Sequence, residues 1–120
     1  MYADQFEARV ARVRHRFAAT LENKIQTAMV SADRMSGNDA SVIKYVAESY
    51  RHLHSMYGIG ASVGFAATGE AAHAAEAALI QAYLEKRGPT ENEVQRLKRA
   101  LTQLRQVAAS ELRMMYQRGR

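Results

Sequence analysis

His54 is the side chain whose sequence neighbours most favour nucleophilic chemistry. It directly follows Leu53, a member of an apolar helical stripe, so it should lie at the edge of a helix rather than in a core. A histidine with one protonated nitrogen and one free lone pair can act as a nucleophile or carry a proton. Residues three, four and seven positions away share its helical surface, and most of them are small: Ala47, Arg51, Gly58 and Ala61.

Gly58, one helical turn after His54, has two interpretations. A glycine inside a helix destabilises it by about 1 kcal/mol relative to alanine, so its presence needs a reason. It could leave open space through which another protein's reactive group approaches the imidazole. Alternatively, it could allow close packing of the alanine-rich helix that follows.

Two further groups, His73 and Glu76, are spaced three residues apart on a later predicted helix. Such spacing also occurs in di-iron bundles, which need two Glu-x-x-His motifs and two more inward-facing glutamates. Only Glu70-x-x-His73 fits that motif, so we predict no metal site. His52 points to a different side of its helix from His54, and no neighbouring group frames it.

Four amphipathic helices should position these groups. We find no alternating strand pattern, and Pro89 separates the last two helical patterns. Thr90 and Glu93 match a capping box, which marks the start of the fourth helix. Helices with short connections pack most simply as an all-α, up-and-down antiparallel four-helix bundle, here a single domain over residues 1–120. The first three helices are predicted at residues 4–34, 41–59 and 65–86.

Three of the helices carry apolar stripes at three- and four-residue steps, which should form the core. The third helix presents mostly alanine. The predicted stripes are Phe6, Val10, Val13, Phe17, Leu21, Ile25 and Met29 in the first helix, Ile43, Val46, Tyr50, Leu53 and Tyr57 in the second, and Val94, Leu97, Leu101, Leu104, Ala108 and Met115 in the fourth.

The composition favours a cytoplasmic globular protein, and we expect it to be a monomer. Hydrophobic residues make up 48% of the 120 residues, and no cysteine is present to form a disulfide or a thiolate metal site. There is no apolar run long enough to span a membrane and no signal-peptide core. The net charge of +5 favours acidic partners, but no nucleic-acid recognition motif accompanies it, so we expect neither nucleic-acid nor membrane binding.

The segment that begins at His54 resembles the phosphoacceptor motif of histidine-containing phosphotransfer domains. That motif has a histidine, an apolar residue two positions on, a basic residue three on, and glycines four and ten on. Here Met56, Gly58 and Gly64 fill the apolar and glycine positions. The resemblance is closest to the phosphotransfer domain of chemotaxis-type histidine kinases, and it covers residues 53–79, about a quarter of the chain.

The resemblance implies a role for each matching residue. His54 would be the phosphoacceptor, Glu76 would orient it, and His73 would support the same polar cluster. Tyr57 replaces the family's basic residue, so that role is either vacant or filled by Arg51 or another cation. The implied partner-docking surface comprises Arg51, Tyr57, Gly58, Ala61 and Gly64.

The resemblance also implies the partners. These are a histidine kinase, the receiver domain of a response regulator, or both, with Mg²⁺ supplied by the partner rather than bound by this chain. The sequence contains no phosphate-binding glycine-rich motif, so we expect a phosphotransfer intermediate and not a stand-alone enzyme with an ATP site. The alternative is a non-catalytic helical adaptor that binds a response regulator or kinase without phosphotransfer.

Overall fold

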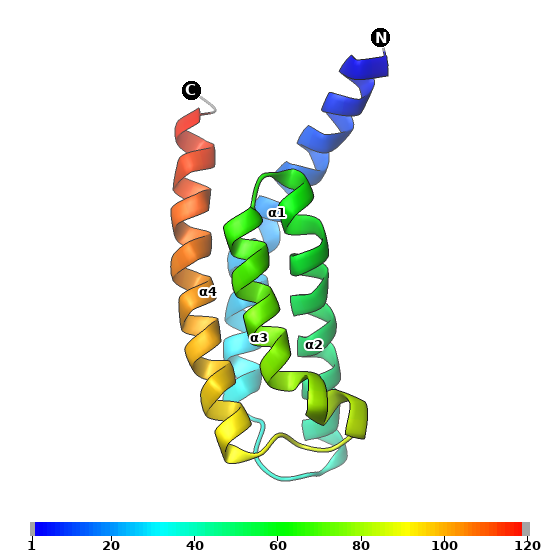
Figure 1. Cartoon of the computed structure of the whole chain (residues 1–120), viewed down its shortest axis with the longest axis vertical. Coiled ribbons are helices and arrows are strands. Elements are labelled where there is room, and N and C mark those ends of the chain that lie inside the picture. The colour runs from blue at the N-terminus through cyan, green and yellow to red at the C-terminus, as the bar shows by residue number, and fades with distance from the viewer. Residues whose placement is uncertain (1, 119–120) are drawn as a thin grey trace.

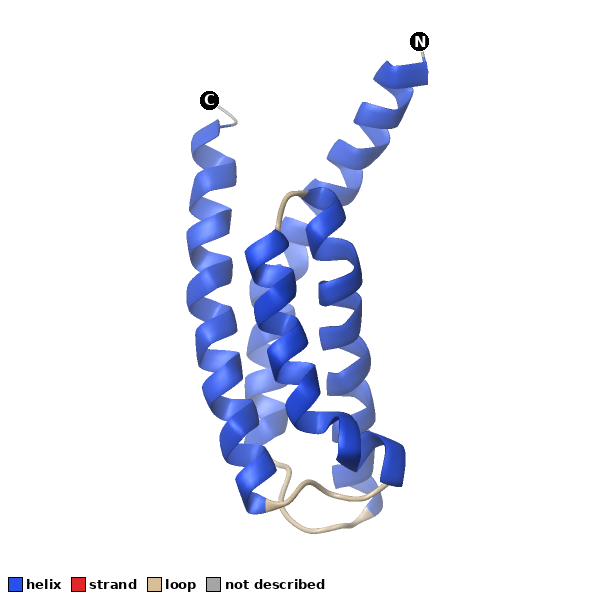
Figure 2. Cartoon of the chain, in the orientation of Figure 1, coloured by secondary structure: helices blue, strands red, loops and turns tan. Residues whose placement is uncertain are grey.

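A computed structural model describes residues 2–118, which fold into four helices and a short 3-10 turn (Figure 1). The first and last residues of the predicted domain, 1 and 119–120, lie outside this part. Within residues 2–118 there is no strand (Figure 2), and the predicted all-α antiparallel four-helix bundle is confirmed. The elements are α1 (Tyr2–Asp33), α2 (Ala40–Gly60), η1 (Ala61–Val63), α3 (Ala66–Glu85) and α4 (Glu91–Arg118).

The core lies between the four helices, but α1 contributes only its C-terminal half. Phe17 is buried, whereas Phe6 and Val13 are 64% and 41% exposed, so the predicted burial of the first turns of α1 is wrong. The reason is visible in Figure 1, where the ends of α1 and α4 extend past the turn that joins α2 and α3. Arg14 lies level with this turn, because its Nε donates to the carbonyl oxygen of Val63 at 2.7 Å.

The buried face of α2 is rotated slightly from the predicted one. Ser49 and Met56 are buried with Val46 and Leu53, whereas Tyr50 and Tyr57 are only partly buried. The predicted stripe placed both tyrosines in the core. Their position at its border brings their rings beside the histidines described below.

The predicted capping box at the start of α4 is confirmed. The Thr90 backbone N–H donates to Glu93 Oε1 at 2.7 Å, and the Glu93 backbone N–H donates to Thr90 Oγ1 at 3.1 Å. Arg87 adds two further bonds to the two Glu93 carboxylate oxygens, at 2.8 and 3.2 Å. The Glu93 carboxylate therefore links the start of α4 to Arg87, which lies two residues after the end of α3.

We predict that Glu93 makes the free energy of unfolding depend on pH in the acid range. The hydrogen bonds from Arg87 lower the pKa of Glu93 from 4.5 to about 2. The stabilisation is therefore complete above about pH 4.5 and is lost as the pH falls towards 2. Glu93→Gln should lower the free energy of unfolding by about 1–3 kcal/mol at pH 7 and by less at pH 3, measured by urea denaturation.

Glu85→Gln is the matched control for this prediction. Its carboxylate also bonds Arg87, at 3.1 Å, but its side chain is 56% exposed, against 14% for Glu93. We expect a change below about 0.5 kcal/mol, because exposed ion pairs contribute little. Equal losses of unfolding free energy in the two variants would contradict the conclusion that Glu93 contributes more to stability than Glu85.

Candidate active site

Helix α2 presents His54 at the bundle surface. The preceding Leu53 is fully buried, which anchors this turn of the helix, while the His54 side chain is 63% exposed. The ring is not free to rotate, because Nδ1 lies 2.9 Å from Oε2 of Glu76 on α3. Glu76 is only 5% exposed, so an almost buried carboxylate holds the inner edge of an exposed imidazole.

The same carboxylate holds a second imidazole. His73 Nδ1 lies 2.9 Å from Glu76 Oε1, and the His73 side chain is 50% exposed. Because a carboxylate accepts hydrogen bonds, each ring donates from Nδ1, and Nε2 of each neutral ring keeps its lone pair. The structure therefore brings together His54, Glu76 and His73, the three residues that the family resemblance pointed to.

Tyrosine rings flank both histidines. Tyr50 lies one turn before His54, with the ring centroids 5.8 Å apart and the planes within 9°. Tyr83 of α3 stacks on Tyr50, with the ring centroids 4.2 Å apart. Tyr57 stacks on His73 at 4.2 Å. These contacts restrict the orientation of each imidazole plane, as aromatic pairs at such distances do.

The Tyr50 hydroxyl is in an environment that keeps it protonated. Burial raises its pKa above 10.0, and the nearby Glu76 charge raises it further. The predicted core stripe of the second helix includes Tyr50, and no sequence pattern singles out Tyr83. The i, i+4 spacing of Tyr50 and His54 was the available signal for the first contact, but nothing local indicated the second.

The space beside His54 is open. A Cβ added at Gly58 would meet no atom within 4 Å, so the interpretation that Gly58 allows close helix packing is wrong. That function belongs to Gly60 and Gly69, where a Cβ atom would meet backbone atoms of the neighbouring segment. A Cβ at Gly60 would lie 2.9 Å from the Phe65 carbonyl oxygen and 3.3 Å from the Gly69 Cα atom.

Alanine substitutions should have opposite effects on stability at Gly58 and Gly60. Gly58→Ala is expected to raise the free energy of unfolding by about 0.5–1 kcal/mol, because it adds helix propensity without a clash. Gly60→Ala should lower it by about 1–3 kcal/mol, because the backbone atoms it meets cannot move cheaply. Urea denaturation of both variants measures the difference, and an equal effect at the two sites would contradict this account.

The five predicted docking residues do not form one uniform patch. Arg51, Gly58 and Ala61 are exposed on α2 and η1, along the helix face that carries His54. Tyr57 is half-buried, and its ring lies against His73. Gly64 is at the far end of this face, where its φ of 89° ends η1 in a left-handed conformation that glycine adopts readily.

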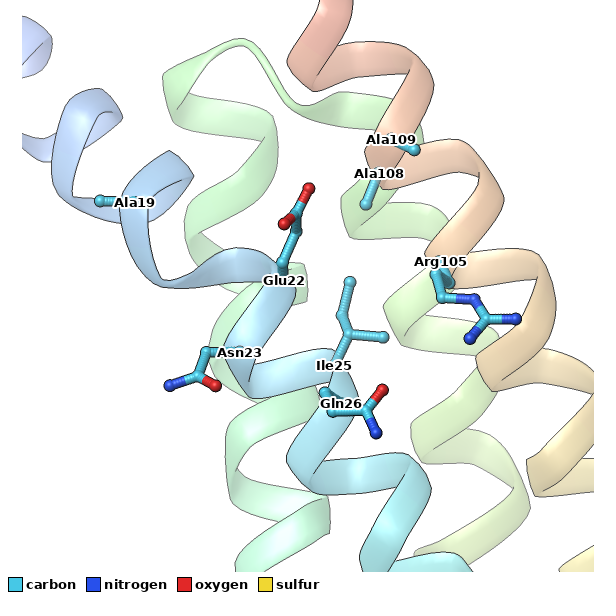
Figure 3. A pocket seen from close by; sticks show the side chains of 8 residues that line it. All are labelled: Ala19, Glu22, Asn23, Ile25, Gln26, Arg105, Ala108 and Ala109. Atoms are coloured by element: carbon cyan, nitrogen blue, oxygen red, sulfur yellow. The ribbon is translucent and has the colours of Figure 1, made fainter.

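Other parts of the described structure offer less chemistry. A pocket of about 500 Å³ opens between α1 and α4 (Figure 3), and none of its lining residues belongs to the helices that carry the histidine pair. Among residues 2–118, no three histidine, cysteine or acidic side chains are grouped so that they could hold a metal ion. No helix in the described range is long and apolar enough to cross a membrane.

The antiparallel four-helix bundle of residues 2–118 is consistent with a histidine-containing phosphotransfer domain. The comparison with family models agrees, since residues 16–107 match the Hpt domain, and this match covers more than half of the chain. The chain therefore belongs to the Hpt domain family and takes part in histidine phosphotransfer in phosphorelays, with kinases or receiver domains as partners. Neither a curated protein nor a solved structure gave a match.

Proposed function

We propose that His54 accepts a phosphoryl group from a histidine kinase or a receiver aspartate and passes it to the aspartate of a response regulator. One observation supports this most strongly. The His54 ring is 63% exposed, while Glu76 holds its Nδ1 at 2.9 Å. An imidazole held in this way directs its unprotonated Nε2 away from the carboxylate and towards an incoming donor.

The proposed transfer step needs few groups from this chain. The Nε2 lone pair of His54 forms a bond to phosphorus while the bond between phosphorus and the donor oxygen breaks, and the donor aspartate leaves as a carboxylate. The Nδ1 proton stays on the ring, and Glu76 offsets the positive charge that develops there, as the triad aspartate does for its histidine. The reverse step delivers the phosphoryl group to the next aspartate.

Charge on the phosphoryl group must also be balanced. In our proposal the partner's active site holds the Mg²⁺ ion, and this chain binds no cofactor. Tyr57 cannot supply the positive charge of the family's basic residue, and its ring lies against His73. Arg51, exposed one turn before His54, is the cation that takes over this role.

The proposed docking surface surrounds His54. Arg51, Gly58 and Ala61 form the part beside the imidazole, with Tyr57 and Gly64 at its border. The open space at Gly58 admits the partner's reactive aspartate. We further propose that the domain works as a monomer in the cytoplasm, where kinases that use ATP and their response regulators meet.

The test is transfer from a phosphorylated receiver domain, with Mg²⁺ present, to the wild-type protein. We expect phosphate that is labile in acid and stable in base, and that mass spectrometry maps to His54. His52 is an internal control, because it is exposed on the same helix. Phosphate that maps to other residues, with none on His54, would overturn the proposal.

The non-catalytic adaptor remains a second candidate because of Tyr57. A ring stacked on His73, in place of a cation near the phosphoryl group, removes one source of charge stabilisation. The adaptor predicts that a receiver binds the bundle while several competent donors leave it unphosphorylated. The same transfer experiment, combined with a binding measurement, distinguishes the two functions.

A further inference from the structure

Glu76 holds two imidazoles in the same way. His54 and His73 each place Nδ1 2.9 Å from a different oxygen of this one carboxylate. Their side chains are 63% and 50% exposed, and each ring has a tyrosine ring beside it. The two contacts that orient the His54 ring, one with the Glu76 carboxylate and one with a tyrosine ring, are therefore repeated at His73.

We propose that His73 is a second phosphoacceptor in this site, an inference that rests on the proposed function of His54. With Nδ1 bonded to the buried carboxylate, Nε2 lies on the side of the half-exposed His73 ring that points away from Glu76. Its lone pair would form a bond to phosphorus while the bond from phosphorus to the donor's leaving group breaks. The Nδ1 proton would stay on the ring, shared with Glu76.

Nearby charged side chains should make the two histidines accept phosphate at different rates. Arg51 precedes His54 by three residues on α2, so it can attract a phosphoryl group there. Glu70 precedes His73 by three residues on α3 and repels one. His54 is therefore the faster acceptor and His73 the slower. Two phosphoryl dianions beside one carboxylate would repel each other strongly, so each chain should carry a single phosphate.

Phosphoramidate is a suitable small donor, because it needs no docking surface and releases ammonia as the phosphorus–nitrogen bond breaks. In His54→Gln, mass spectrometry should locate phosphate on His73. His52 is the matched control, since among the described residues the structure gives its side chain no hydrogen bond. We expect labelling of His73 to be on the order of tenfold faster than that of His52, a modest share of what positioned proton-accepting groups contribute.

Two further measurements sharpen the test. Adding Glu70→Gln to His54→Gln should raise the labelling rate of His73 by about twofold, the scale of one like-charge contact on a helix. In the wild-type protein, where folding is not in question, we expect phosphate on His73 only in molecules whose His54 is unmodified.

The outcomes separate this inference from the proposed function. Phosphate on wild-type His54, with labelling of His73 in His54→Gln no faster than that of His52, would overturn the second acceptor and leave the function of His54 intact. Failure of wild-type His54 to accept phosphate from either donor would instead overturn the proposed function, and with it this inference.

Discussion

His54→Gln is expected to slow phosphotransfer from a phosphorylated receiver by on the order of a thousandfold or more, the scale seen when a covalent nucleophile is removed. The change deletes the Nε2 lone pair that accepts the phosphoryl group. It should leave the free energy of unfolding within about 0.5 kcal/mol of the wild type, because the side chain is 63% exposed. Rapid-quench measurement of phosphate on the bundle, with any phosphate on His73 counted separately by mass spectrometry, gives the rate, and urea denaturation gives the stability.

His52→Gln is the control for this variant. It removes an exposed imidazole two residues away on the same helix and changes neither the carboxylate nor the open space at Gly58. We expect an unchanged transfer rate. A similar loss in both variants would show that the substitutions act on the helix or on docking, and not through the nucleophile.

Glu76→Gln is expected to slow transfer to His54 by on the order of 10²–10⁴-fold. A glutamine can place its amide N–H₂ against Nδ1, which favours the tautomer with the proton on Nε2 and removes the lone pair needed for attack. The fold should persist, since glutamine has nearly the same shape and no buried charge. Binding of the unphosphorylated receiver should also be unchanged.

A tautomer measurement tests whether Glu76 acts by positioning His54. Nitrogen chemical shifts of the His54 ring, measured by NMR, should show the proton on Nδ1 in the wild type and a shift towards Nε2 in Glu76→Gln. Glu70→Gln is the matched control, because it neutralises an exposed carboxylate on the same helix. Slow transfer with an unaltered tautomer would contradict the proposed role of Glu76.

The predictions that succeeded from sequence rest on local rules. Three- and four-residue spacing identified the helices, and the Thr90–Glu93 capping box formed as predicted because its partners are three residues apart. The predictions that failed depended on how far neighbouring helices extend. Phe6 continues a regular stripe, yet it is exposed, because the N-terminal end of α1 extends past the turn that joins α2 and α3 (Figure 1).

The features of the candidate site also fall into those that the sequence predicted and those that only the tertiary structure shows. Sequence spacing was enough to predict His54 at the edge of its helix, and the family resemblance pointed to Glu76 and His73. Only the tertiary structure decided that one carboxylate bonds both imidazoles and that Tyr83 stacks on Tyr50.

The physical reason lies in the packing of α2 against α3. The direction in which a side chain leaves its helix follows from 3.6 residues per turn, which is a local property. Which side chains meet across two helices depends on how the helices slide and rotate against each other. Here Gly60 and Gly69 hold the two backbones in close contact, and this contact sets the level at which Glu76 faces His54.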